Sequence, residues 1–131
     1  MSTMIFSDYA KHVNGKLTTC DIEKKNIKNA KKFVKNNRDF VDFIVDDSIN
    51  FLSSFDQKID LLYLDSLDGQ LKEASKHQLQ EIKVSLDKLH NNSLVLLDDK
   101  GSKTNLSIDF MLNNNFRIIN ETQEQVLLSL K

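Results

Sequence analysis

Short apolar runs alternate with helical patterns along this chain of 131 residues. The runs that predict strands are residues 16–20, 40–45, 59–64 and 94–97. Apolar residues at helical spacing predict helices over 21–37, 49–52, 70–90 and 103–113. Two further runs, 116–119 and 126–130, lie either side of a short polar connection. They predict an antiparallel hairpin.

The first thirteen residues also have a helical pattern, which Ser2 or Thr3 is suited to cap. Their apolar stripe is Ile5, Tyr9 and Val13, and we expect it to face the core. The stripes of the later helices are Ile27, Ala30, Phe33 and Val34; Leu79, Ile82, Leu86 and Leu89; and Leu106, Phe110 and Met111.

Strands that alternate with helices form right-handed βαβ units, which close into a mainly parallel sheet with helices on both faces. The pattern therefore predicts an α/β fold, a three-layer sandwich with a C-terminal antiparallel hairpin. Near-continuous apolar runs are typical of strands that are buried on both faces. The length predicts a single domain over residues 1–131.

Composition narrows the class of protein. Hydrophobic residues are 40% and charged residues 28% of the chain, which is typical of a packed globular domain. The 18 basic and 19 acidic residues leave a net charge of -1, which argues against a nucleic-acid partner. No apolar run approaches the ~20 residues that span a bilayer, and no export signal is visible. The lone Cys20 cannot form an internal disulfide. We expect a cytoplasmic protein with no membrane partner.

An acidic residue follows each of the four strands that we expect to be parallel. These residues are Asp21, Asp46 and Asp47, Asp65, and Asp98 and Asp99. Ligands of open parallel sheets bind beyond the carboxyl ends of the strands, so this acidic rim predicts ribose hydroxyls, an amine or a metal cation as its partner. Aspartate also caps helices that follow strands, and capping alone explains Asp21 and Asp47 equally well.

The most specific candidate site is formed by Asp65, Asp98 and Asp99. If their strands are neighbours, the strand ends lie about 4.8 Å apart, and the three carboxylates could share one Mg²⁺ ion. The alternative is that Asp98 and Asp99 are solvated turn residues before Gly101. Cys20 lies inside a predicted strand and is expected to be a small core residue rather than a nucleophile.

With these residues in order, the chain resembles the Rossmann-like S-adenosylmethionine-dependent methyltransferases, in particular their small-molecule O-methyltransferase branch. The segments that are similar to the family's second to fifth strands are GKLTTCDIEKKNIKNAKKFV (15–34), VDFIVDDSINFL (41–52), IDLLYLDSLD (59–68) and NNSLVLLDDKG (91–101). The terminal hairpin resembles the sixth and seventh strands.

The resemblance implies a role for each acid. Asp21 would bind the cofactor ribose, Asp47 and Ser48 would lie by the adenine, and Asp65 would lie near the reacting end of the cofactor as the catalytic residue. In cation-dependent members the metal is shared by the fourth-strand aspartate and the acidic pair, here Asp65, Asp98 and Asp99. The implied reaction is methyl transfer from S-adenosylmethionine to an oxygen or nitrogen of a small-molecule acceptor, with Mg²⁺ in some members.

One part of the family pattern has no counterpart. The family's first strand and its Gly-x-Gly loop are absent, and Gly15, Gly69 and Gly101 are scattered. Residues 1–13 are similar to the family's segment directly after that loop, so we expect an N-terminally truncated methyltransferase domain that is inactive without the first motif. The alternatives are that the flanking strands pair directly, or that a second chain or copy completes the sheet. The rival function is a non-catalytic α/β module that acts by protein association.

Overall fold

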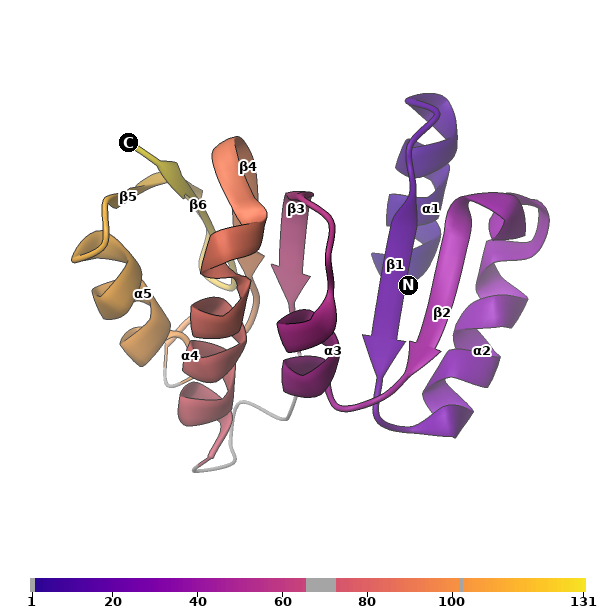
Figure 1. Ribbon diagram of the computed structural model, residues 1–131, viewed down its shortest axis with the longest axis horizontal. Coiled ribbons are helices and arrows are strands. Elements are labelled where there is room, and N and C mark those ends of the chain that lie inside the picture. Colours follow the sequence, from indigo (N-terminus) through magenta and orange to yellow (C-terminus); the bar gives the residue numbers. More distant parts are fainter. Residues whose placement is uncertain (1, 66–72, 102) are drawn as a thin grey trace. The chain divides into compact units, whose positions relative to one another are not determined.

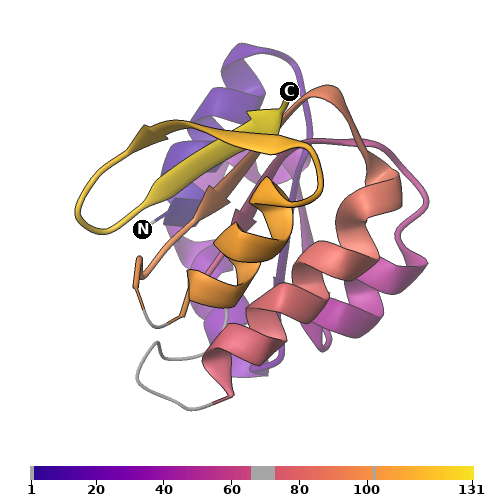
Figure 2. The ribbon, with the colours of Figure 1, turned by 90° about the vertical axis from the view of Figure 1, so that its left-hand side faces the viewer.

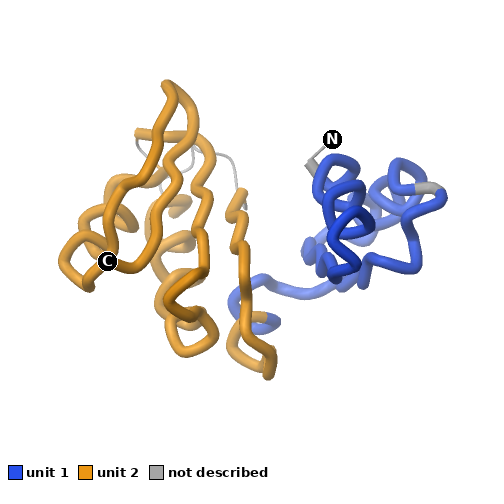
Figure 3. Tube along the Cα trace, turned by 90° about the horizontal axis from the view of Figure 1, so that it is seen from above, with its two compact units in different colours: residues 1–51 blue, residues 52–131 orange. Residues whose placement is uncertain are grey.

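Helices and strands alternate along the computed structural model, which describes residues 2–65, 73–101 and 103–131 (Figure 1). The chain divides into two units, residues 1–51 (unit 1) and 52–131 (unit 2) (Figure 3). Each unit has its own sheet. Gly69, the start of the predicted 70–90 helix and the predicted capping side chain of Ser2 lie outside the described part.

Unit 1 pairs two parallel strands and packs helices on them. Its elements are α1 (Ser2–His12), β1 (Leu17–Asp21), α2 (Lys24–Val34), the 3-10 helix η1 (Lys35–Phe40) and β2 (Val41–Val45). The strands run in register from Leu17 opposite Val41 to Asp21 opposite Val45. A turn precedes β1, in which Asn14 has a φ of 55° and the Gly15 N–H donates to the Ala10 carbonyl oxygen (2.7 Å).

The helix α1 is confirmed, but the prediction of its buried face was wrong. Ile5, Tyr9 and Val13 are all exposed, and the buried residues are Ser7 and Ala10. The reason is that α1 packs against α2 and η1 through a polar contact, in which Asn37 Nδ2 donates to Ser7 Oγ (3.2 Å). Spacing alone cannot show which face a helix turns towards its neighbours.

Unit 2 contains a four-stranded sheet in the order β3-β4-β6-β5. Its elements are β3 (Ile59–Leu64), α4 (Ala74–Ser85), the 3-10 helix η2 (Leu86–Lys88), β4 (Leu89–Leu97), α5 (Asn105–Leu112), β5 (Phe116–Glu121) and β6 (Val126–Leu130). The boundary between the two units falls inside α3 (Ser48–Ser54). β3 and β4 are parallel, whereas β6 is antiparallel to both β4 and β5. The predicted hairpin is therefore confirmed. α4 and α5 pack together on one side of this sheet (Figure 2).

Burial in the unit 2 sheet differs from strand to strand. It alternates over the second half of β4, where Ser93, Val95 and Leu97 are buried, whereas β5 is exposed after Phe116. In β3, Leu62 and Leu64 are buried and Leu61 is 39% exposed. Burial on both faces, as the apolar runs suggested, therefore holds for only part of β3. In the described strands β1 pairs with β2 alone and β3 pairs with β4 alone, so these residues form two sheets rather than one continuous sheet. The predicted α/β class with parallel pairing and a terminal hairpin is confirmed.

Several helix predictions needed correction. The 21–37 helix is shorter, because Asp21 belongs to β1 and residues after Val34 form a 3-10 helix. The buried face of α4 carries the polar Gln78 and Glu81 beside Ile82, and the predicted Leu89 begins β4 instead. Exposed positions within the predicted stripes are Phe33 and Leu106. None of the described helices has the length and apolar character needed to cross a bilayer.

Candidate functional site

The carboxyl ends of β1 and β2 lie side by side in unit 1. Asp21 is the last residue of β1, and Asp46 and Asp47 directly follow β2. The Asp46 N–H donates to the Asp21 carbonyl oxygen (3.1 Å), which extends the parallel pairing by one residue. The sequence expectation that these acids share one edge of a sheet is confirmed within this unit.

Asp21 and Asp47 each accept a backbone hydrogen bond near the start of the next helix. Asp21 Oδ1 accepts from the Glu23 N–H (2.8 Å), and its Oδ2 accepts from Asn26 Nδ2 (3.2 Å). Asp47 Oδ1 accepts from the Ile49 N–H (3.2 Å) in α3, which begins at Ser48. The capping interpretation is therefore confirmed for Asp47, whereas Asp21 bonds to the N–H of Glu23, one residue before α2 begins. These contacts leave the ligand interpretation open, because each carboxylate oxygen can accept a second hydrogen bond.

A small pocket of about 190 Å³ opens beside Asp21. It is lined by Asp21 and Thr19 from β1, Thr3 from α1 and Asn26 from α2, among others. These side chains offer hydroxyl, amide and carboxylate groups, so the pocket can hydrogen-bond a polar ligand.

The half-buried Cys20, next to Asp21 in β1, does not have the low thiol pKa of a reactive cysteine. Burial, reinforced by Asp46 and Asp21, raises the pKa of its thiol from 9.0 to about 11, which keeps it protonated at neutral pH.

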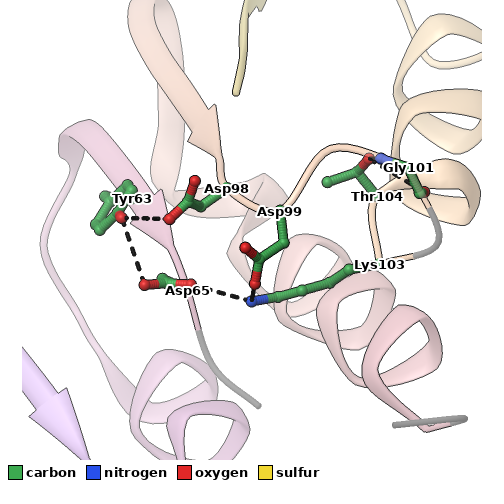
Figure 4. A network of polar contacts seen from close by, with 7 residues as sticks. All are labelled: Tyr63, Asp65, Asp98, Asp99, Gly101, Lys103 and Thr104. Atoms are coloured by element: carbon green, nitrogen blue, oxygen red, sulfur yellow. Dashed lines mark hydrogen bonds and ion pairs between the residues drawn. The ribbon is translucent and has the colours of Figure 1, made fainter. Parts of the chain in front are cut away.

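The carboxyl ends of β3 and β4 bring together three carboxylates in unit 2. Asp65 directly follows β3, and Asp98 and Asp99 directly follow β4. The Asp98 N–H donates to the Leu64 carbonyl oxygen (3.3 Å), so the strands remain paired to their ends. One carboxylate oxygen from each of the three residues lies within 4.8 Å of the others (Figure 4). The predicted grouping of these acids is confirmed, and we call it the acidic cluster.

Tyr63 donates a hydrogen bond into the acidic cluster. Its hydroxyl lies 3.0 Å from Asp98 Oδ2 and 3.5 Å from Asp65 Oδ2 (Figure 4). Burial of the ring, together with the negative charge of Asp65 and Asp98, raises the pKa of the Tyr63 hydroxyl. The phenol therefore stays protonated and acts as a donor to the carboxylates.

Lys103 places a cation among the same carboxylates. Its Nζ lies 3.1 Å from Asp65 Oδ1 and 3.2 Å from Asp99 Oδ2 (Figure 4). The lysine side chain is fully buried at 0% exposure, whereas those of Asp65 and Asp99 are 44% and 50% exposed. Sequence reasoning missed Lys103 and Tyr63. The available signals were weak: Tyr63 lies two residues before Asp65 on an extended strand, and Lys103 lies four residues after Asp99.

The turn between β4 and α5 sets the position of Lys103. Asp99 has a φ of 56° and Gly101 a φ of 118°, a value that side chains rarely allow. The Gly101 N–H donates to Thr104 Oγ1 (2.9 Å), and the Asn105 N–H donates to the Gly101 carbonyl oxygen (3.0 Å). Thr104 is itself fully buried. These contacts hold the turn closed and direct the lysine to the strand ends.

The residues of the acidic cluster, taken together, fit Mg²⁺ poorly. Mg²⁺ binds oxygen at about 2.0–2.1 Å, so an ion on Asp65 Oδ1 or Asp99 Oδ2 would lie within about 5 Å of the ammonium of Lys103. At an effective dielectric constant of about 20, a divalent cation and an ammonium at that separation repel by roughly 7 kcal/mol, which offsets part of the attraction between the ion and the three carboxylates. An ion on either of these oxygens would also compete with Nζ for it.

Comparison with known families identifies the class of protein. The family model described as a methyltransferase domain matches residues 1–100. The chain therefore belongs to the methyltransferase domain family, which confirms the family part of the sequence resemblance. A comparison with curated proteins found no match.

Solved structures agree on the fold. A candidate rRNA methylase from Clostridium thermocellum is 18% identical with a TM-score of 0.67, covering 90% of this chain and 76% of that one. An SAH-bound methyltransferase from Podospora anserina is 15% identical with a TM-score of 0.67, covering 88% and 61%. A candidate methyltransferase from Streptococcus mutans in complex with SAH is 14% identical with a TM-score of 0.60, covering 88% and 76%.

These similarities confirm the Rossmann-like methyltransferase fold. The chain spans 61% to 76% of the length of these three structures. Their names cover more than one type of methyltransferase, so the small-molecule O-methyltransferase branch stays a prediction, as do the individual site residues.

Proposed function

We propose that this chain is an S-adenosylmethionine-dependent methyltransferase domain which, with the family's first strand and Gly-x-Gly loop supplied, transfers a methyl group to an oxygen or nitrogen of a small-molecule acceptor. The observation that carries the proposal is the acid at the carboxyl end of each parallel strand, in a chain of the methyltransferase domain family. Two of the similar structures are bound to SAH, the form of this cofactor that remains after the methyl group has left.

The acids of unit 1 would bind the nucleoside part of the cofactor. Asp21 has spare acceptor capacity on both carboxylate oxygens and lines the 190 Å³ pocket, which suits it to accept from ribose hydroxyls. Asp47 and Ser48 would lie by the adenine, at the end of the neighbouring strand.

Asp65 would act at the acceptor. S-adenosylmethionine supplies an electrophilic methyl carbon, and an acceptor hydroxyl or ammonium must lose a proton when it takes the methyl group. Asp65 Oδ1 contacts Lys103 and its Oδ2 lies near the Tyr63 hydroxyl, so the carboxylate is held in one orientation and remains 44% exposed. A carboxylate held in this way can align the acceptor and take its proton.

Calorimetric titration with SAH tests the proposal. The sequence contains no Gly-x-Gly loop, so we expect weak but measurable binding to the nucleoside contacts. Asp21→Asn removes a charged acceptor and is expected to weaken binding about tenfold or more, because a hydrogen bond to a charged group contributes ~1.5–3 kcal/mol. The matched control is Asp42→Asn, which removes the same charge from an exposed β2 residue paired with Lys16. Equal binding by both variants, or none by the wild-type chain, would contradict the proposal.

The rival function, a non-catalytic module that acts by association, has one observation in its favour. β1 and β3 each have a single strand partner among the described residues, so each has an edge with backbone groups available for pairing. If a second copy of the chain completes the sheet, sedimentation velocity will show a dimer whose population grows with concentration. A monomer that binds SAH would exclude this function.

A further inference from the structure

We propose that Lys103 is the resident cation of the acidic cluster, and that the cluster therefore works without a divalent metal ion. This inference concerns which cation the carboxylates of Asp65, Asp98 and Asp99 hold. It does not depend on whether the chain transfers methyl groups.

The described contacts already give each carboxylate of the acidic cluster a donor. Lys103 Nζ contacts Asp65 at 3.1 Å and Asp99 at 3.2 Å, and the Tyr63 hydroxyl donates to Asp98 at 3.0 Å (Figure 4). Three carboxylates whose oxygens gather within 4.8 Å repel one another unless donors or cations lie among them. The ammonium and the phenol fill that role from within the chain.

A metal ion cannot readily displace Lys103 from the acidic cluster. Its side chain is fully buried, and its backbone is part of the Gly101–Thr104 turn, whose hydrogen bonds lead into α5. Moving Nζ away from the acidic cluster would separate a buried ammonium from its carboxylates, and this separation would cost several kcal/mol of stability, on the order of that for breaking a buried ion pair. An exposed surface lysine, by contrast, could swing into solvent.

Lys103 is therefore a positioning residue. By joining Asp65 after β3 to Asp99 after β4, it fixes both carboxylates while leaving about half of each side chain exposed to solvent. The exposed oxygens of Asp65 and Asp99 are then available to accept a hydrogen bond from a hydroxyl or amine, rather than to bind Mg²⁺.

Metal binding by the wild-type chain and two variants tests the inference. Lys103→Met removes the ammonium and keeps an unbranched side chain of similar length. The matched control, Lys100→Met, removes the same charge from the same turn, where Lys100 pairs with Glu121 and does not contact the acidic cluster. Thermal unfolding is measured with and without 10 mM Mg²⁺, and NMR line broadening by Mn²⁺ locates any bound ion.

We expect Mg²⁺ to leave the Tm of the wild-type chain and of Lys100→Met unchanged, and to raise that of Lys103→Met by ~3 °C or more. We also expect Mn²⁺ to broaden the Asp65 and Asp98 signals only in Lys103→Met. Selective broadening of those signals in the wild-type chain would overturn the inference, and this result is obtained even if Lys103→Met does not fold. A folded Lys103→Met that gains no Mg²⁺ response would also count against it.

Discussion

The two sets of strand-end acids bond in different ways. In unit 1, Asp21 and Asp47 contact groups within five residues along the chain, at or just before the start of the next helix. In unit 2, Asp65 contacts Lys103, 38 residues away, and Asp98 contacts Tyr63, 35 residues away. The first set is local and keeps acceptor capacity for a ligand, whereas the second is a long-range network with its own cation. Acids in the same topological position can therefore serve different chemistry.

The largest effect is expected from Lys103→Met in unit 2. Removing one partner of a buried ion pair costs ~3–5 kcal/mol, and the half-exposed carboxylates reduce this to about 2 kcal/mol of unfolding free energy. Urea denaturation measures it. Lys100→Met, whose pair with Glu121 is partly exposed, should lose less than ~1 kcal/mol. Equal losses in the two variants would mean that the network is no stronger than a surface pair.

A smaller loss is expected from Asp21→Ala in unit 1. The change removes the acceptor of the Glu23 N–H and of Asn26 Nδ2, and loss of such exposed hydrogen bonds costs ~1 kcal/mol. Asp42→Ala, which breaks only an exposed pair with Lys16, should be close to neutral in the same urea experiment. A loss in Asp21→Ala as large as that in Lys103→Met would remove the distinction between the local and long-range sets.

Tyr63→Phe should cost ~0.5–1.5 kcal/mol at neutral pH, because it removes one hydrogen bond from the acidic cluster. The pKa of Tyr63 is raised in the folded protein above its ordinary 10.0, so its contribution is present below pH 10 and is lost as the pH rises further. The difference in unfolding free energy between wild type and Tyr63→Phe should shrink above pH 10. A difference that stays constant up to pH 11 would exclude a protonated donor.

The smallest effect concerns Cys20 and appears as a rate. Its pKa of about 11 predicts that iodoacetamide modifies the folded chain slowly at pH 9, with a rate that rises towards pH 11. The chain unfolded in urea, whose thiol has the ordinary pKa of 9.0, is the control. Equal rates in the two states at pH 9 would show that the folded β1 does not protect the thiol.

The sequence was sufficient to predict the elements whose signal is local. The 59–64 strand, the terminal hairpin and the acids at the strand ends are found where the pattern places them. Features that depend on tertiary packing were missed. The face of α1 that carries Ile5 is exposed, and α4 buries Gln78 and Glu81, because the neighbours of a helix decide which side is covered.

Lys103 shows the same limit within the site. A lysine just before a helix ordinarily lies in solvent, and its burial here follows from the turn at Asp99 and Gly101, which brings it to the end of a strand 38 residues earlier in the chain. Local patterns report charge and periodicity. They do not report which distant carboxylate will meet a given ammonium.

The proposed function depends most on whether the acids at the strand ends of unit 1 bind the nucleoside of the methyl donor. Backbone amide NMR spectra of the wild-type chain, recorded during titration with SAH, test this binding residue by residue. We expect saturable shifts of the Asp21, Asp47 and Ser48 signals, with a midpoint that Asp21→Asn moves to about tenfold or more higher SAH concentration and Asp42→Asn leaves unchanged. An unchanged spectrum, or shifts that leave these three residues unaffected, would show that the nucleoside does not bind there.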